Sequence, residues 1–184
     1  MKIQRDFFCG KPVAVARALV GAYLCRRMPD GSIIRARICE LELYTPQDRA
    51  CHAYNYHRTP RNSAMFLCGG HTYIYLCYGL HYMFNIVLGP SEYPAAVLIR
   101  ALEYSGCDGP AKLTRILGIT RAENCLDLCA GDTIWLEPRD HAVKIKTAPR
   151  IGIDFAGRDA LRPWRFLIAT SRFISRPAPN NKKV

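Results

Sequence analysis

Alternating polar and apolar positions dominate the first quarter of the chain. The alternation continues through the run SIIRARICELELY at residues 32–44, which predicts a β-strand with one covered face. Its phase shifts near Cys39, so an irregularity in the strand is expected there. The turn residues Pro29-Asp30-Gly31 lie just before this run, and residues 26–44 are therefore expected to form a strand, a turn and a strand. Residues 12–24 begin with proline and space their apolar positions as on one face of a helix, which predicts a short helix.

The rest of the chain continues this mixture of strands and short helices. A second helix is expected at residues 109–119, which place proline in the first turn and Gly118 near the end. Between them lies a long polar loop at residues 45–61, and long loops of this kind are usually functional or disordered. Further strands are expected at residues 71–77, 82–88, 95–103, 132–138, 142–148 and 164–170, with a turn at residues 78–81.

These elements predict one domain of the α+β class over residues 1–184. Its sheet should be mostly antiparallel, curved and barrel-like, with short helices at its flanks. No internal repeat or linker divides the chain. The polar, basic end of the sequence, residues 176–184, is expected to fray.

The charge balance points to a polyanionic partner. The 184 residues include 26 Lys and Arg against 15 Asp and Glu, for a formal net charge of +11. Such an excess favours nucleic acid or an anionic membrane, although a charge that only maintains solubility is the simpler alternative. No signal peptide and no apolar run long enough to cross a bilayer is visible, so no membrane association is expected. We expect cytoplasmic localisation in a prokaryote and nuclear localisation in a eukaryote.

Cysteine and histidine patterns give no metal or redox motif. The nine cysteines are an odd number without a CxxC pair, and the five histidines show no metal-ligand spacing. Reduced, structural thiols and a protein without metal or cofactor are therefore expected. Cys51 and His52 are neighbours, but adjacent residues of an extended segment point in opposite directions, so they are not expected to form a catalytic pair.

Two features could carry chemistry, and each has a structural alternative. Residues 71–87, HTYIYLCYGLHYMFNIV, contain four tyrosines, which suit either an aromatic core or a surface that stacks on nucleobases. Glu42 ends an apolar strand and is a candidate general base, or else a structural ion-pair partner of Arg100 or Arg37. Arg100 lies inside the apolar run AAVLIRALE and must meet an anion if it is buried.

Eight segments together carry a family resemblance over residues 5–175. They are RARICELELY (35–44), DRACH (48–52), RTPRNSAMF (58–66), TYIYLCYGLHYMFNIV (72–87), AAVLIRALE (95–103), GPAKL (109–113), DTIWLE (132–137) and RIGIDFAGRDALRPWRF (150–166). In this order they resemble the alkyladenine (3-methyladenine) DNA glycosylase family. Residues 44–52 and the passage between Glu103 and Gly109 are shorter than is usual in that family.

The resemblance implies a monofunctional glycosylase that acts in base excision repair. It would flip 3-methyladenine, 7-methylguanine, hypoxanthine or ethenoadenine out of double-stranded DNA and release the base by hydrolysis, as a monomer and without a cofactor. The matching catalytic positions are Glu42 as general base, Arg100 as a water-holding residue, and the backbone carbonyl of Ile151. Glu40, two residues before Glu42, is expected to be dispensable for the chemistry.

The resemblance also assigns residues to the base and to the DNA. A protruding hairpin would enter the minor groove and insert Tyr78 in place of the flipped nucleotide. The residues that match the base pocket are Tyr44, His52, Tyr75, Asn85 and Leu98, and Asn85 would exclude the 2-amino group of guanine. Arg61, Leu80 and His81 are candidates for contacts to the DNA backbone and minor groove.

Two other functions remain open from the sequence. One is a non-catalytic nucleic-acid binding module that stacks bases on aromatic residues and holds phosphates with arginine. The other is a small-molecule enzyme on a barrel-like fold, which the high positive charge disfavours. A binding module needs no carboxylate near phosphates, so the presence of both Glu42 and Arg100 favours the enzyme.

Overall fold

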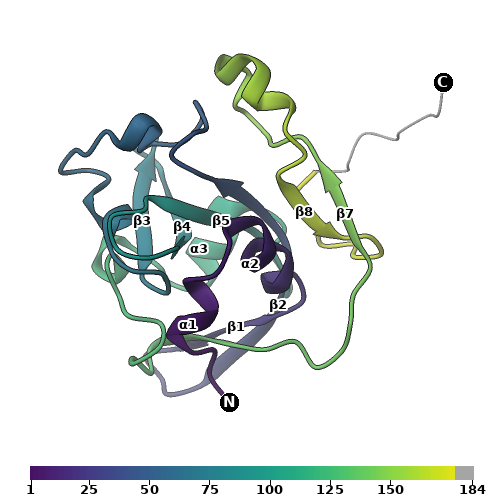
Figure 1. Ribbon diagram of the computed structural model, residues 1–184. Helices are drawn as coiled ribbons and strands as arrows, with labels where there is room; N and C mark the ends of the chain where they lie inside the picture. The colour runs from purple at the N-terminus through teal and green to yellow at the C-terminus, as the bar shows by residue number, and fades with distance from the viewer. Residues whose placement is uncertain (177–184) are drawn as a thin grey trace.

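The long strand β2 (Ile33–Tyr44) organises the sheet of this protein, whose residues 1–176 are described by a computed structural model (Figure 1). One edge of β2 pairs with β5 (Ala95–Glu103). The other edge is shared end to end by β1 (Tyr23–Arg27) and β8 (Arg165–Ile168). Because twelve residues are long enough for two short partners, the sheet can continue in two directions from this strand.

Every strand pairing of the sheet is antiparallel. The strand order is β3-β4-β5-β2-β1-β6, and β8 joins β7 to β2. The sheet curls into a half-barrel, with α2 and α3 packed against it and α1 beside α2 (Figure 1). This confirms the expected α+β class and the curved antiparallel sheet. The remaining elements are α1 (Arg5–Phe8), α2 (Pro12–Leu19), β3 (Thr72–Cys77), β4 (His81–Leu88), α3 (Pro110–Ile116), β6 (Ile134–Glu137) and β7 (Ile145–Ala148), with 3-10 helices at Tyr54–Tyr56, Ser63–Phe66, Arg121–Glu123 and Asp154–Leu161.

A β-bulge in β2 determines which side chains face the core. The register against β5 shifts between Ile38 and Glu40 and again between Glu40 and Leu41. After the bulge, Leu41 and Leu43 enter the core, whereas Glu40 and Glu42 share the opposite face. The predicted phase shift is therefore confirmed. Glu40 and Glu42 share a face because they are two residues apart in a strand, and the bulge decides that this face is the one away from Leu41 and Leu43.

The first helix is shorter than predicted. Helix α2 begins at Pro12 as expected and buries Leu19, but it ends there instead of reaching residue 24. Gly21 has a positive φ of 91°, which turns the chain out of the helix, and Leu24 pairs with strands on both sides in β1. The apolar spacing continued past the true end because the inward residues of a strand are apolar too.

Helix α3 ends at the glycine that marks its end in the sequence. Gly118 adopts a φ of 59°, and the next N–H, of Ile119, donates to the carbonyl of Thr114 at 2.8 Å. This left-handed residue caps the last turn, as glycine commonly does.

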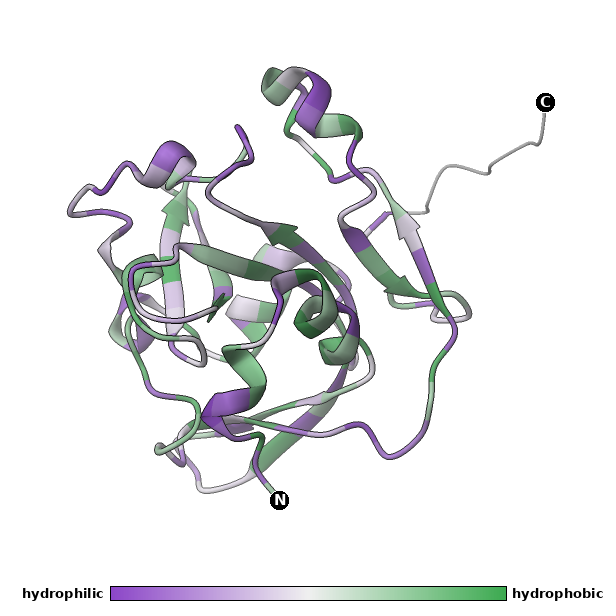
Figure 2. Ribbon diagram, in the orientation of Figure 1, coloured by the Kyte–Doolittle hydropathy of each residue, from purple (hydrophilic) through white to green (hydrophobic). Residues whose placement is uncertain are grey.

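The core fills the hollow of the sheet. Its large buried side chains come from the helices and the strands alike, and they include Phe8, Leu19, Leu41, Phe84 and Phe166. Burying a side chain of this size contributes about 1.5–3 kcal/mol. Figure 2 shows apolar residues along α2 and much of β5, which pack against each other.

All nine cysteines are free thiols. Burial raises the pKa of the Cys25, Cys39 and Cys51 thiols to about 12, so these groups stay protonated and unreactive near neutral pH. The prediction of structural thiols is confirmed for these three. The expected frayed end cannot be compared beyond Arg176, because residues 177–184 lie outside the described part of the chain.

Candidate active site

A cavity of about 470 Å³ opens where the β3–β4 hairpin, β5, the long loop and residues 150–155 meet. This volume lies within the range of small-molecule sites, about 300–1,000 Å³. Nine of the residues that the resemblance assigned to function line it: Tyr44, His52, Arg61, Tyr75, Tyr78, Asn85, Leu98, Arg100 and Ile151. The fold thus brings together side chains that are spread over more than half of the sequence.

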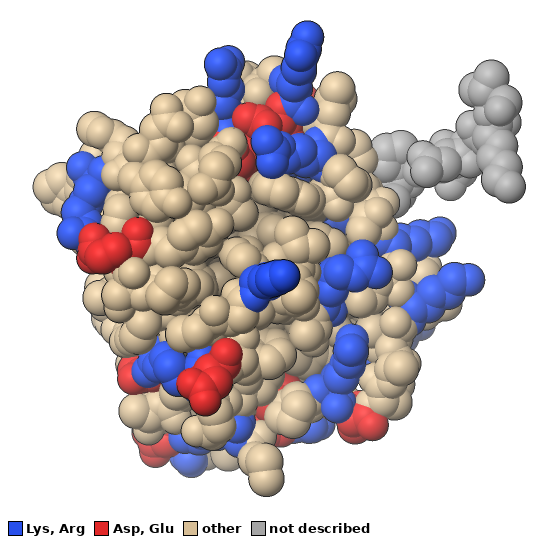
Figure 3. Space-filling view, viewed as in Figure 1, with Lys and Arg blue, Asp and Glu red and all other residues tan. Residues whose placement is uncertain are grey.

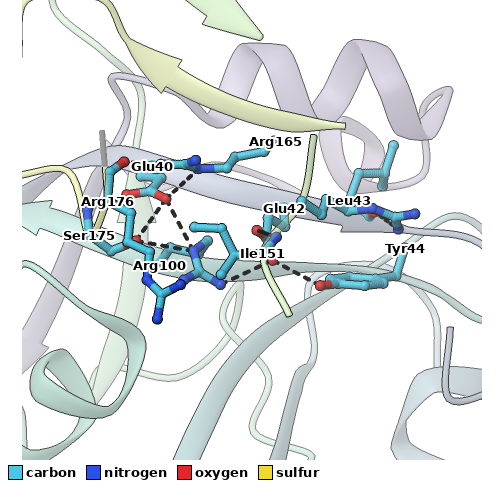
Figure 4. A network of polar contacts seen from close by, with 10 residues as sticks. Glu40, Glu42, Leu43, Tyr44, Arg100, Ile151, Arg165, Ser175 and Arg176 are labelled. Atoms are coloured by element: carbon cyan, nitrogen blue, oxygen red, sulfur yellow. Dashed lines mark hydrogen bonds and ion pairs between the residues drawn. The ribbon is translucent and has the colours of Figure 1, made fainter. Parts of the chain in front are cut away.

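Glu42 lies behind this cavity and is fully buried. Its Oε2 accepts a hydrogen bond from the Tyr44 hydroxyl at 2.8 Å and one from Arg100 Nη1 at 3.1 Å. Its Oε1 accepts one from the N–H of Ile151 at 2.8 Å (Figure 4). Three donors therefore stabilise the charged carboxylate, and the residues that supply them, Tyr44, Arg100 and Ile151, also line the cavity.

Arg100 is the buried cation that this carboxylate requires. It is 7% exposed and lies on β5, which pairs with β2. From there its side chain can reach both carboxylates of β2, Glu40 and Glu42. Its guanidinium contacts Glu40 through Nε and Glu42 through Nη1, each at 3.1 Å. Of the two ion-pair partners considered for Glu42, Arg100 is correct, whereas Arg37 pairs with Glu103 at 2.8 Å.

Ile151 contacts Glu42 through its backbone N–H. The role that the resemblance assigned to its backbone carbonyl stays a prediction. The segment that follows also contributes Gly152 and Ile153 to the cavity wall.

Aromatic side chains form the walls of the cavity. The imidazole of His52 packs edge-on against Tyr75, with ring centroids 4.6 Å apart, and its Nδ1 lies 2.8 Å from the Tyr73 hydroxyl. Burial raises the pKa of Tyr75 to about 12 and that of Tyr44 well above its usual range, so both phenols keep their protons. Tyr44 therefore acts as a donor to Glu42.

The surroundings of His52 favour its neutral form. The surrounding protein lowers the pKa of its imidazole, and the nearby Arg61 cation lowers it further. The residue stays exposed to solvent, which limits that shift.

Asn85 and Leu98 lie opposite each other on β4 and β5. The side-chain amide of Asn85 donates to the carbonyls of Tyr73 and Met83, at 3.0 and 3.2 Å. These hydrogen bonds fix the amide nitrogen, and within residues 1–176 the side-chain oxygen has no such partner and can accept a hydrogen bond from a molecule in the cavity.

Some tyrosines of residues 71–87 lie in the core, and others lie where they could stack on a nucleobase. Tyr73 is buried and Tyr82 packs against the core, whereas Tyr75 lines the cavity. Tyr78 is 93% exposed at the β3–β4 turn and has a φ of 51°, a conformation that bulky residues rarely adopt. An exposed aromatic residue held in a strained backbone conformation is typical of a functional position.

The three candidates for DNA contacts lie near this turn but not all in the cavity. Arg61 lines the cavity, and its guanidinium lies 5.6 Å from the ring centre of Tyr75. Leu80 is 74% exposed and, with His81, borders a separate hollow that also includes Lys112 and Arg115 from α3.

Several residues of the site could not be singled out from the sequence. Phe155 is 76% exposed and lines the cavity. The one feature of the sequence that could have pointed to it is its position as an aromatic residue in the polar run DFAGRD. The fully buried pair of Arg150 and Asp48 had none, because nothing in the sequence links two residues so far apart. Arg150 also lies over the ring of Tyr44, with its guanidinium carbon 4.7 Å from the ring centre.

The positive charge remains on the surface. The buried charged residues are four arginines and three acidic residues: Arg26, Arg100, Arg150, Arg165, Glu40, Glu42 and Asp48. Because their charges nearly cancel, almost all of the net positive charge belongs to residues that are not buried. Lys and Arg side chains spread over the face shown in Figure 3 and gather on the side of β7 and β8. Within residues 1–176, no helix is long and apolar enough to span a membrane, and no cluster of His, Cys, Asp or Glu is placed to hold a metal ion.

Comparison with known proteins places this chain in one family. The model of the methylpurine-DNA glycosylase family matches residues 6–172. A protein of Methanocella arvoryzae is 40% identical, with 97% of this chain and 98% of the relative covered. Proteins of Anaeromyxobacter dehalogenans (43% identical; 97% and 89% covered) and Borrelia garinii subsp. bavariensis (38% identical; 95% and 100% covered) are similar in the same way. All three bear the name 3-methyladenine DNA glycosylase. The chain therefore belongs to the methylpurine-DNA glycosylase family.

Proposed function

We propose that this protein is a monofunctional DNA glycosylase that flips damaged purines out of duplex DNA and hydrolyses the bond between base and sugar. The observation that carries the proposal is Glu42, a buried carboxylate at the base of an aromatic-lined cavity, held by Arg100, Tyr44 and Ile151. The family and the names of the relatives support the same activity.

Glu42 would act as the general base for an attacking water. A carboxylate offers about four acceptor positions. Oε2 already accepts two hydrogen bonds and Oε1 only one, so Oε1 keeps the capacity to accept from a water. The water loses its proton to Glu42 as it attacks the sugar C1′, and the C1′–N bond breaks with its electron pair leaving on the purine. The products are a free base and an abasic site.

The aromatic walls would select and activate the leaving base. A cationic lesion such as 3-methyladenine leaves readily and gains from contact with the faces of Tyr44 and Tyr75. Neutral lesions such as hypoxanthine or ethenoadenine need protonation to become comparable leaving groups. A neutral His52 adds no positive charge beside a cationic base, which suits the first class.

Hydrolysis without strand cleavage follows from the side chains at the cavity. Covalent glycosylase chemistry requires an amine nucleophile, and a lysine would be the usual source. None of the lining residues in the part of the chain that the structure describes is a lysine.

Duplex DNA would meet the face that carries the β3–β4 turn. Tyr78 and Leu80 present apolar surface there, as side chains that insert between base pairs do. Arg61, Lys112 and Arg115 lie near enough to this turn to contact phosphates on either side of it. We propose that the protein acts on the duplex as a monomer.

A base-release assay tests the proposed function directly. Duplexes carrying 3-methyladenine, 7-methylguanine, hypoxanthine or ethenoadenine are incubated with the protein, and free base and abasic sites are quantified. Release of at least one of these bases without strand nicking is expected. Tight binding to lesion duplexes without release of any base would instead favour a non-catalytic binding module.

Replacing Tyr78 by serine should weaken binding to lesion-containing duplex. Stacking of one aromatic side chain on a base contributes about 1–3 kcal/mol, so the dissociation constant should rise roughly 5- to 150-fold. The free energy of unfolding should change by only about 0.5 kcal/mol, because the side chain is exposed. Fluorescence anisotropy with a lesion duplex measures the first effect, and thermal melting measures the second.

The matched control is Tyr104→Ser, which removes another exposed tyrosine away from the cavity. It should bind lesion DNA as the wild type does. Equal affinities for the two variants would show that Tyr78 is not the inserted side chain.

Replacing Asn85 by serine should relax the exclusion of guanine derivatives. The shorter side chain opens space beside Leu98, and steric discrimination of this kind is worth about 1–3 kcal/mol. The ratio of 7-methylguanine release to hypoxanthine release should therefore rise roughly tenfold in single-turnover assays. Loss of the side-chain hydrogen bonds to the carbonyls of Tyr73 and Met83 should lower the free energy of unfolding by about 1 kcal/mol.

Met83→Leu controls for a general change at the cavity wall, since it conserves volume at another lining position. Its release ratio should match that of the wild type. An unchanged ratio in Asn85→Ser would exclude Asn85 as the residue that discriminates against guanine.

A further inference from the structure

Glu40 is the most heavily hydrogen-bonded carboxylate near the proposed catalytic group, although the resemblance gives it no role. It is fully buried on the same face of β2 as Glu42. Its Oε1 accepts hydrogen bonds from Arg165 Nε at 2.7 Å, Ser175 Oγ at 2.9 Å and Arg100 Nε at 3.1 Å. Its Oε2 accepts one from the N–H of Ser175 at 2.5 Å (Figure 4).

Two buried carboxylates and two buried guanidinium groups make up this network, so its formal charges balance. Glu40 and Glu42 face Arg100 and Arg165, and all four side chains are less than a tenth exposed. Within residues 1–176, Glu40 is the ion-pair partner of Arg165. Glu40 therefore has a second cation and does not depend on Arg100 for neutralisation. The contact of Glu40 with Arg100 is therefore additional to the charge balance of the Glu40–Arg165 pair.

The geometry of Arg100 gives that additional contact a consequence. A guanidinium is a rigid plane, so a bond at Nε restricts where Nη1 can lie. Glu40 holds Nε, and Nη1 is the atom that contacts Glu42. Loss of Glu40 would let the plane rotate and draw Nη1 away from Glu42.

We propose that Glu40 is a positioning residue for base excision, which holds the Arg100 guanidinium in place against Glu42. Ser175, from the last described segment of the chain, in turn holds Glu40 and also lies 3.3 Å from Arg100 Nε. This inference rests on the proposed function. It replaces the expectation that Glu40 is dispensable, because that expectation treated Glu40 as a side chain without a link to the site.

A double-mutant cycle distinguishes positioning from a purely structural ion pair. Single-turnover base release is measured for the wild type, Glu40→Gln, Arg100→Gln and the double variant, and the affinity of each for the lesion duplex is measured separately. Coupled neighbours commonly differ from additivity by factors of roughly 2 to 150. Glu40→Gln should slow release about 10- to 100-fold with unchanged affinity, but it should slow release less than about threefold when Arg100 is already glutamine.

Two outcomes of the cycle overturn the proposal. Equal slowing by Glu40→Gln in both backgrounds would show that Glu40 does not act through Arg100. A wild-type release rate in Glu40→Gln would show that it has no role in catalysis. Failure of the proposed function is a separate result, because the wild-type protein would then release none of the lesions.

Ser175→Ala provides a milder variant if Glu40→Gln does not fold. It removes the hydroxyl contacts to Glu40 and Arg100 but keeps the backbone N–H and the charges. Release should slow about two- to fivefold at unchanged DNA affinity, in line with the loss of one modest hydrogen bond. The melting temperature should fall by no more than about 2–4 °C. Ser171→Ala, in the same segment, is the matched control and should keep the wild-type rate. Equal rates for the two serine variants would then overturn the proposal.

Discussion

Glu42→Gln should fold, bind lesion DNA about as tightly as the wild type, and lose nearly all base release. Glutamine keeps the shape of the side chain and can still accept hydrogen bonds through its oxygen from Tyr44 and Arg100. It cannot take a proton from water. General base catalysis typically accelerates a reaction by about 10²–10⁴-fold, and we expect a loss of that size in the single-turnover rate constant.

The control for this variant must be a carboxylate outside the network. Glu103→Gln meets that condition, since Glu103 pairs with Arg37 at the other end of β5 and is partly exposed. It should release base at close to the wild-type rate. If Glu42→Gln also releases ethenoadenine or hypoxanthine at close to the wild-type rate, Glu42 is only a structural ion-pair partner of Arg100 and not the general base.

Strand positions were predictable wherever the pattern was strong. The apolar run at residues 95–103 is β5 without any change of bounds, and the alternation of residues 32–44 gave both β2 and its bulge. The end of α2 was missed because helical and strand spacing of apolar residues overlap for a few positions around Gly21. The order in which strands pair could not be obtained from local patterns, since β8 joins the C-terminal part of β2 across more than one hundred residues.

The cavity-lining residues were found through the resemblance, whereas the contacts that orient them were not. Aromatic and amide residues such as Tyr75 and Asn85 lie within recognisable motifs. The residues behind them are held by partners distant in sequence, such as Glu40 with Ser175, 135 residues apart. The sequence does not distinguish a buried arginine from an exposed one, so the fold is needed to show which arginines stabilise the site.

The ion pair of Asp48 and Arg150 is the second place where one substitution should have a large effect. Both side chains are completely buried. Arg150 bonds to both carboxylate oxygens of Asp48 and also donates to the carbonyls of Leu43 and Asp159, at 2.8 and 2.9 Å. Asp48 additionally accepts the N–H of Ala50 at 3.1 Å, within the loop that carries His52. The pair thus joins the long loop to the end of β2 and to residues 150–159.

Asp48→Asn should lower the free energy of unfolding by about 3–5 kcal/mol, because it leaves a buried guanidinium without its counter-charge. For a chain of this size the melting temperature should fall by roughly 6–20 °C. Urea unfolding measures the first quantity and calorimetry the second. Asp108→Asn is the matched control: its pair with Lys112 is exposed, and pairs of that kind contribute about 0–1 kcal/mol.

The loss should extend to catalysis because Arg150 is directly next to the site. Its guanidinium lies over Tyr44, and the next residue along the chain, Ile151, donates to Glu42. An unpaired cation that moves toward solvent would pull on both contacts, so Asp48→Asn should also release base more slowly below its melting temperature. Adding Arg150→Gln removes the unpaired charge and should restore part of the stability. If Asp48→Asn instead unfolds within about 0.5 kcal/mol of the wild type, the pair contributes no more than an ordinary surface substitution does, and the loop must be held by its other contacts.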